Sequence, residues 1–76
     1  MSSFVVEYNR KTRDWFVTSY PGTNGRKRAM AHRFELERRR PTTDWEIVSL
    51  NSDSIDTIRK THSRYFEGRE LSASPF

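Results

Sequence analysis

The chain contains no cysteine, and this absence removes two ways of holding a small fold together. Without thiols there is neither a disulfide framework nor a thiolate metal site. A chain without cysteine also suits a reducing compartment. The 76 residues must therefore form one domain with a modest apolar core, and a domain of this size is only marginally stable.

Long apolar runs are absent as well. The opening segment, MSSFVVEYNRK, holds only three consecutive apolar residues. That pattern fits neither the apolar core of a signal peptide nor a transmembrane helix. We therefore expect a cytoplasmic protein that makes no use of a membrane.

Motifs for catalysis or cofactor binding are also lacking. His32 and His62 have no metal-site spacing and no cysteine to support them. The segment 22–27 places glycines before a helix start, but it lacks the spacing and the hydroxyl residue of a phosphate-binding loop. Ser54 and Ser63 have no neighbouring base that the sequence would place beside them. We expect no enzyme activity, no cofactor and no metal.

Two β-branched and aromatic runs open the chain, FVVEY at 4–8 and WFVTSY at 15–20. This composition is typical of strands, and the polar stretch NRKTRD between them indicates a hairpin. Pro21, Gly22 and Gly25 then break the chain before a helix that is predicted from about residue 26 or 27 to Arg39. Pro41 ends this helix, because the residue before a proline is driven out of the helical region.

The second half supplies one more strand and one more helix. WEIVSL at 45–50 has strand composition, and Ser52 or Asp53 can cap the helix that follows. This second helix is predicted from about residue 54 to 66, because apolar residues recur there at helical spacing. The stripe consists of Ile55, Ile58, His62, Tyr65 and Phe66.

The element order ββαβα predicts a small α+β domain over residues 1–68. We favour a three-stranded antiparallel sheet of order 2-1-3 with both helices packed on one face. A mixed sheet would follow if the third strand paired with the second. Residues 69–76 are predicted to form a flexible tail with little to bury. The expected core consists of Phe4, Val6, Val17, Met30, Phe34, Ile47, Ile55, Ile58 and Tyr65.

The charge is unevenly distributed along the chain. Residues 1–40 hold ten basic and four acidic side chains, a net of +6, whereas residues 41–76 hold four basic and six acidic ones, a net of −2. A basic half favours anionic partners such as nucleic acid or an acidic protein surface.

The cations gather at three places, which we take as the candidate binding residues. They lie at the hairpin tip, at the start of the first helix and at its end: Arg10, Lys11, Arg13, Arg26, Lys27, Arg28, Arg38, Arg39 and Arg40. Arginine suits phosphate oxygens, so the first hypothesis is backbone contact with DNA or RNA. Tyr8, Phe16 and Tyr20 would add base stacking if one face of the sheet were open.

A second hypothesis stays open. The basic residues are spread around the first helix rather than gathered on one face, which weakens the nucleic-acid hypothesis. The alternative is a protein-interaction adaptor or inhibitor, of the kind that phages and mobile elements encode. Such a module would dock its basic face on an acidic protein surface. Neither hypothesis predicts an oligomeric state.

Overall fold

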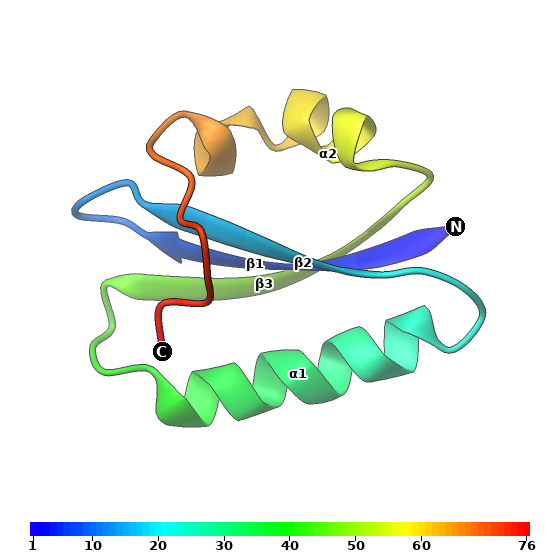
Figure 1. The fold of residues 1–76 in the computed structure, drawn as a ribbon, viewed down its shortest axis with the longest axis horizontal. Coiled ribbons are helices and arrows are strands. Elements are labelled where there is room, and N and C mark those ends of the chain that lie inside the picture. Colours follow the sequence, from blue (N-terminus) through cyan, green and yellow to red (C-terminus); the bar gives the residue numbers. More distant parts are fainter.

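The computed structural model describes residues 1–76 and shows a three-stranded sheet between two helical layers (Figure 1). The chain forms β1 (Ser2–Asn9), β2 (Trp15–Tyr20), α1 (Gly25–Arg39), β3 (Trp45–Ser52), α2 (Ile55–Thr61) and a short 3-10 helix, η1 (Ser63–Phe66). The predicted element order is therefore confirmed.

The sheet has the order β2-β1-β3, and β1 is antiparallel to both of its neighbours. Val6 of β1 lies between Val17 of β2 and Val48 of β3. The predicted antiparallel sheet of order 2-1-3 is confirmed. β2 and β3 run in the same direction with β1 between them, and α1 provides the crossover that joins them.

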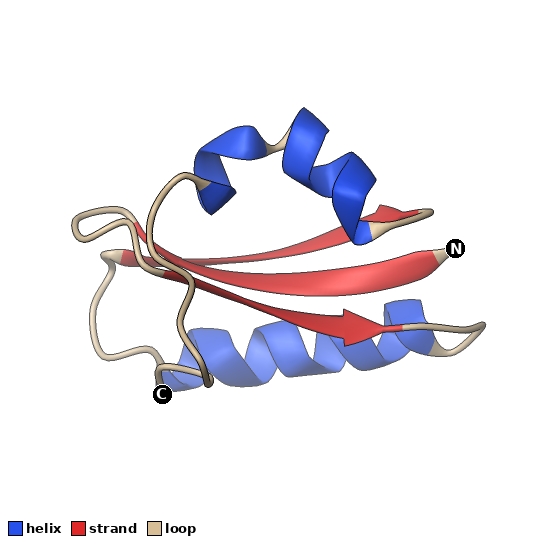
Figure 2. Ribbon diagram, turned by 45° about the horizontal axis from the view of Figure 1, so that its top comes forward, coloured by secondary structure: helices blue, strands red, loops and turns tan.

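The prediction that both helices pack on one face is wrong, because α1 covers one face and α2 with η1 covers the other (Figures 1 and 2). Val5 packs with Ala29 and Leu36 of α1, whereas Val6 packs with Tyr65 of η1. Successive side chains of a strand point to opposite faces. The two adjacent valines, both fully buried, therefore require a cover on each side.

The face of α1 that meets the sheet also differs from the prediction. Ala29 and Leu36 are buried, whereas Phe34 is 57% exposed and Met30 is only half-buried. Met30 and Phe34 do form an i, i+4 pair, but this pair lies on a different side of the helix from the line through Ala29 and Leu36. The small side chain of Ala29 lets the helix approach the sheet.

The ends of α1 follow local chemistry. A side chain at Gly25 would collide with the backbone carbonyl of Tyr20, so the helix can start this close to β2 only with glycine there. At the other end Arg40 has an extended ψ of 135°, as expected for a residue before Pro41.

The second helix is shorter than predicted. Ser54 caps α2, and its side chain accepts a hydrogen bond from the amide of Thr57. α2 then ends at Thr61, because His62 leaves the helical region with φ −126° and ψ 45°. His62 is exposed rather than part of the apolar stripe, while Ile58 and Tyr65 on either side of it are buried as expected.

The tail lies against the sheet rather than away from it. Trp15 of β2 donates to the carbonyl of Arg69 at 3.0 Å and accepts from the amide of Leu71 at 2.8 Å. Further along, the ring of Phe76 meets Trp45 edge-on, with ring centres 5.5 Å apart. The tail therefore makes several contacts with the rest of the fold, although none of residues 69–76 is fully buried, and its flexibility stays a prediction.

Candidate functional site

The nine predicted cations lie in two groups at opposite ends of α1. The hairpin tip and the C-terminal end of α1 lie at one end of the molecule, and residues 26–28 lie at the other (Figure 1). A helix of 15 residues separates the two groups by about 20 Å. The structure thus brings two of the three predicted basic clusters together and keeps the third apart.

The hairpin tip is held by Asn9, whose side-chain oxygen accepts from the amides of Lys11 and Thr12 at 2.9 Å each. Arg13 completes the turn with a φ of 69°, an uncommon conformation for a residue other than glycine. Its guanidinium lies 3.7 Å from Glu67. Lys11 projects from the tip without a carboxylate partner among the ion pairs of the structure.

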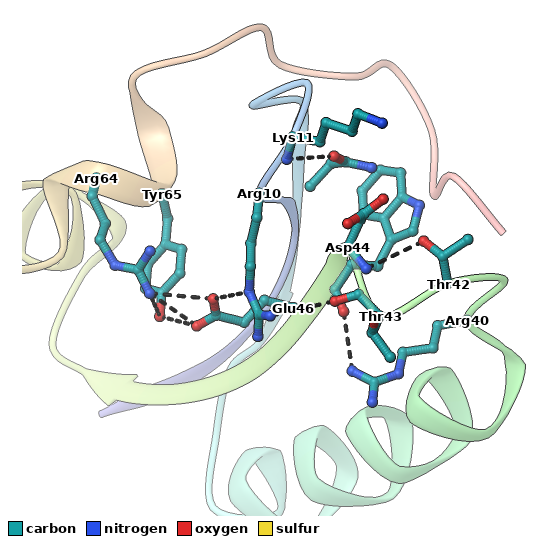
Figure 3. Close-up of polar contacts among 11 residues, drawn as sticks. Arg10, Lys11, Arg40, Thr42, Thr43, Asp44, Glu46, Arg64 and Tyr65 are labelled. Carbon is teal, nitrogen blue, oxygen red and sulfur yellow. Dashed lines mark hydrogen bonds and ion pairs between the residues drawn. The ribbon is translucent and has the colours of Figure 1, made fainter.

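Glu46 gathers three groups at the base of this tip (Figure 3). It accepts from Arg10 at 3.1 Å, from Arg64 at 3.0 Å and from the hydroxyl of Tyr65 at 2.6 Å. Burial acts to raise the pKa of Glu46, but these hydrogen bonds and the positive charge of Arg64 outweigh it and lower that pKa. Arg10 and Arg64 therefore share one carboxylate, whose single negative charge offsets one of their two positive charges.

The backbone of Arg10 also joins the hairpin tip to the loop after α1. Its amide donates to the carbonyl of Asp44 at 2.8 Å. Arg40 bonds to the same region, where its guanidinium donates to the carbonyl of Trp45 at 3.1 Å (Figure 3). A carbonyl does not cancel a charge, so Arg40 keeps its full positive charge, as does Arg39, whereas Arg38 is paired with Glu35.

The start of α1 is more strongly basic than its end. Arg26, Lys27 and Arg28 are exposed, none is paired with a carboxylate, and no acidic residue lies in the first turn. The side chain of Asn24 does not cap the helix. The guanidinium of Arg28 lies over the ring of Tyr20 at 5.2 Å, which keeps it beside the sheet.

Six of the nine predicted cations thus have no carboxylate partner. These are Lys11, Arg26, Lys27, Arg28, Arg39 and Arg40.

The aromatic residues of the sheet do not have the open face that base stacking would require, because both faces of the sheet are covered. Tyr8 is buried, and Phe16 and Tyr20 are half-buried. The sheet offers no open face on which bases could stack.

Sequence reasoning missed two features of this surface. Arg64 and Glu46 are far apart in sequence, so only the fold reveals that they form an ion pair and that Glu46 also pairs with Arg10. The other feature is a shallow groove along α1, lined by Thr23, Arg26, Lys27, Met30, Ala31 and Phe34. The Met30–Phe34 pair that lines this groove was visible in the sequence, but its spacing equally suited the core.

One acidic side chain is buried at the centre of the sheet. Glu7 is fully buried on the α1 face, and its Oε2 atom has no hydrogen-bond partner. Burial raises the pKa of Glu7, although a hydrogen bond from Ser74 and the charge of Arg39 act against this rise. Burial also lowers the pKa of His32, with Arg39 adding to the effect.

No family model, curated protein or solved structure matches this chain. None of its helices combines the length and the apolar character needed to cross a membrane.

Proposed function

We propose that this chain is a non-enzymatic binding module that contacts the phosphate backbone of nucleic acid through its basic first helix and hairpin tip. The observation that carries this proposal is the first turn of α1, where three cations stand together without a carboxylate partner. Its contacts would be made with phosphate oxygens, which arginine and lysine bind in any sequence.

The three cations at the start of α1 are electrostatically unfavourable for the helix, and a bound anion would remove this cost. The N-terminal end of a helix carries a partial positive charge, so acidic residues stabilise this end and basic residues destabilise it. Arg26, Lys27 and Arg28 place three positive charges there. A polyanion would relieve their mutual repulsion and would also accept hydrogen bonds from free amides of the first turn.

Because both faces of the sheet are covered, base stacking on the sheet is excluded as a mode of binding. Base stacking on Tyr8, Phe16 or Tyr20 would require an open face, and neither face is open. We therefore expect backbone contact with little sequence preference, and a strong dependence of affinity on salt.

The test compares two variants that each remove three positive charges. One replaces the unpaired Arg26, Lys27 and Arg28 with Gln, and the other replaces the paired Arg10, Arg13 and Arg38 with Gln. Binding to a labelled DNA duplex and to a labelled RNA is measured by fluorescence anisotropy at low salt. The first variant should bind both clearly more weakly than the second. The proposal fails if the parent binds neither nucleic acid, or if the two variants lose affinity equally.

A protein-interaction module is the second candidate function, and the exposed Phe34 favours it. Interfaces between proteins combine an apolar centre with a polar rim, and the groove around Met30, Ala31 and Phe34 is edged by Arg26 and Lys27. An acidic protein would be retained in a pull-down from the native host, and that binding would require Phe34 as well as the cations. Phosphate contact would not require Phe34.

A further inference from the structure

β3 is an edge strand with one side unpaired. It pairs with β1, and no backbone hydrogen bond joins residues 46–52 to any segment beyond β1. The opposite edge of the sheet, on β2, is partly covered, because Trp15 bonds to Arg69 and Leu71 of the tail. Exposed edge strands are commonly protected by charges or prolines. β3 holds a single charge, Glu46, and no proline.

The apolar flank of α1 lies on the same side of the molecule as this open edge. Arg26 lines a hollow with Asn51 near the end of β3, and Arg40 bonds to Trp45 at its start. Met30 follows Arg26 by about one helical turn, and Glu37 follows Arg26 by eleven residues, which is about three turns. All three side chains therefore lie on one flank of the helix. On the other flank Arg28 and His32 lie against Tyr20 of β2.

We infer that this side binds a second copy of the chain, with β3 paired antiparallel to β3 of the other copy. The pairing would join two three-stranded sheets into one of six strands about a two-fold axis. The axis would pass near Val48 and Ser49, the middle of β3. It would place the two α1 helices antiparallel on the same face of the sheet.

The same two-fold axis would relate both the β3 strands and the α1 helices of the two copies. Since Arg40 lies at the start of β3 and Arg26 near its end, the middle of α1 lies over the middle of β3. Around that midpoint Met30 of one copy comes opposite Phe34 of the other. The same axis brings Arg26 opposite Glu37 of the second copy.

This self-complementarity is the reason for choosing a second copy over an unrelated partner. The flank carries a cation at one end and a carboxylate at the other, so an antiparallel copy matches each with its opposite. In the single chain Glu37 is held by Arg33 at 3.0 Å and is still about one-third exposed, which leaves room for a second cation. Arg26 has no partner of its own.

The assembly would change the basic surface. It would place residues 26–28 of one copy beside residues 38–40 of the other, and so join two groups that the single chain keeps about 20 Å apart. These like charges repel, so added salt should strengthen the dimer by screening them. The inference does not depend on the proposed function, because the dimer would form without nucleic acid.

Sedimentation velocity over a range of protein and salt concentrations tests the inference. The parent should shift toward twice the mass of the 9.1 kDa chain as protein concentration rises, and more readily at high salt. Phe34→Ser should weaken the dimer without unfolding the chain, because Phe34 is exposed. A parent that stays monomeric under all conditions would overturn the inference. The inference would also be overturned if the chain stayed monomeric and used Phe34 to bind an acidic protein.

A charge-swap cycle identifies the interface. Arg26→Glu and Glu37→Arg should each raise the dimer Kd by about tenfold, because each sets like charges against each other. The double variant Arg26→Glu/Glu37→Arg should recover most of the loss. The two positions are eleven residues apart on one helix, so recovery can only come from contact between copies. A dimer that ignores both single changes, or a double variant that does not recover, would contradict this interface.

Discussion

The hydroxyl of Ser74 donates a hydrogen bond of 2.9 Å to Oε1 of Glu7, and so joins the C-terminal tail to the central strand. Glu7 is fully buried, and this bond is the one side-chain hydrogen bond that its carboxyl group accepts. A tail residue therefore satisfies a polar group at the centre of the fold.

Ser74→Ala should consequently destabilise the domain by about 1–3 kcal/mol, because it leaves a buried acceptor without its donor. Ser72 provides the matched control, since it is an exposed serine of the same tail without a side-chain hydrogen bond. Chemical denaturation of the three proteins measures the difference. Equal stability of both alanine variants would mean that the tail does not hold Glu7.

Replacing Glu7 with Gln should change how stability depends on pH. The folded chain holds the Glu7 proton more tightly than the unfolded chain, because burial raises its pKa above the usual 4.5. This group therefore makes stability fall as pH rises from about 4.5 toward the raised pKa of the folded state. Glu7→Gln lacks this fall, so its stability relative to the parent should increase across that range and then level off.

Denaturation of parent and Glu7→Gln at a series of pH values tests this expectation. His32 contributes in the opposite direction, because its lowered pKa makes stability fall as pH drops below the usual 6.5. That contribution is present in both proteins and cancels in their difference. A stability difference that is the same at every pH would contradict the role assigned to Glu7.

The two sides of α1 should respond differently to truncation. Leu36→Ala should cost about 2–5 kcal/mol, since Leu36 is 1% exposed and packs between the helix and the sheet. Phe34→Ala should cost well under half of that, because most of the ring is already in water. Thermal melting at low protein concentration measures both in the single chain. A larger loss for Phe34→Ala would restore the sequence-based view that Phe34 is core.

Glu46→Gln should increase affinity for nucleic acid. The carboxylate forms ion pairs with both Arg10 and Arg64, and the amide would hold both less tightly and leave them freer for phosphate contact. The slope of log affinity against log salt should steepen by about 0.9 for each cation that reaches a phosphate on duplex DNA. Anisotropy titrations at several salt concentrations measure the slope. Unchanged or weaker binding by a folded variant would show that this end of the molecule does not face the ligand.

The elements and their pairing could be predicted from the sequence because local signals agree. The composition of the strand segments predicts the strands, the polar loop after Asn9 predicts the hairpin, and Pro41 predicts the end of α1. The hairpin places the second strand beside the first, whereas the sequence left open whether the third strand pairs with the first or with the second, and the structure shows the first.

The placement of the helices could not be predicted in the same way. Val5 and Val6 are adjacent, and the sequence does not show that both are covered. Met30 and Phe34 have helical spacing that suits a core as well as a surface. The contacts of the tail, Ser74 with Glu7 and Phe76 with Trp45, could not be predicted because they join residues more than thirty positions apart.

The basic site was predictable in part. The cations are visible in the sequence, but which of them are neutralised depends on distant carboxylates such as Glu46 and Glu67. The structure therefore divides the predicted set into paired and unpaired members, and this division is what the proposed function uses.

The salt dependence of DNA binding by the parent protein tests the central claim most directly. Six predicted cations are unpaired, and each phosphate contact contributes a slope of about −0.9 on duplex DNA, so these six together can contribute a slope of about −5. We predict measurable affinity at low salt with a slope between about −2 and −5 in log affinity against log salt. No affinity at low salt, or binding that added salt does not weaken, would contradict the account.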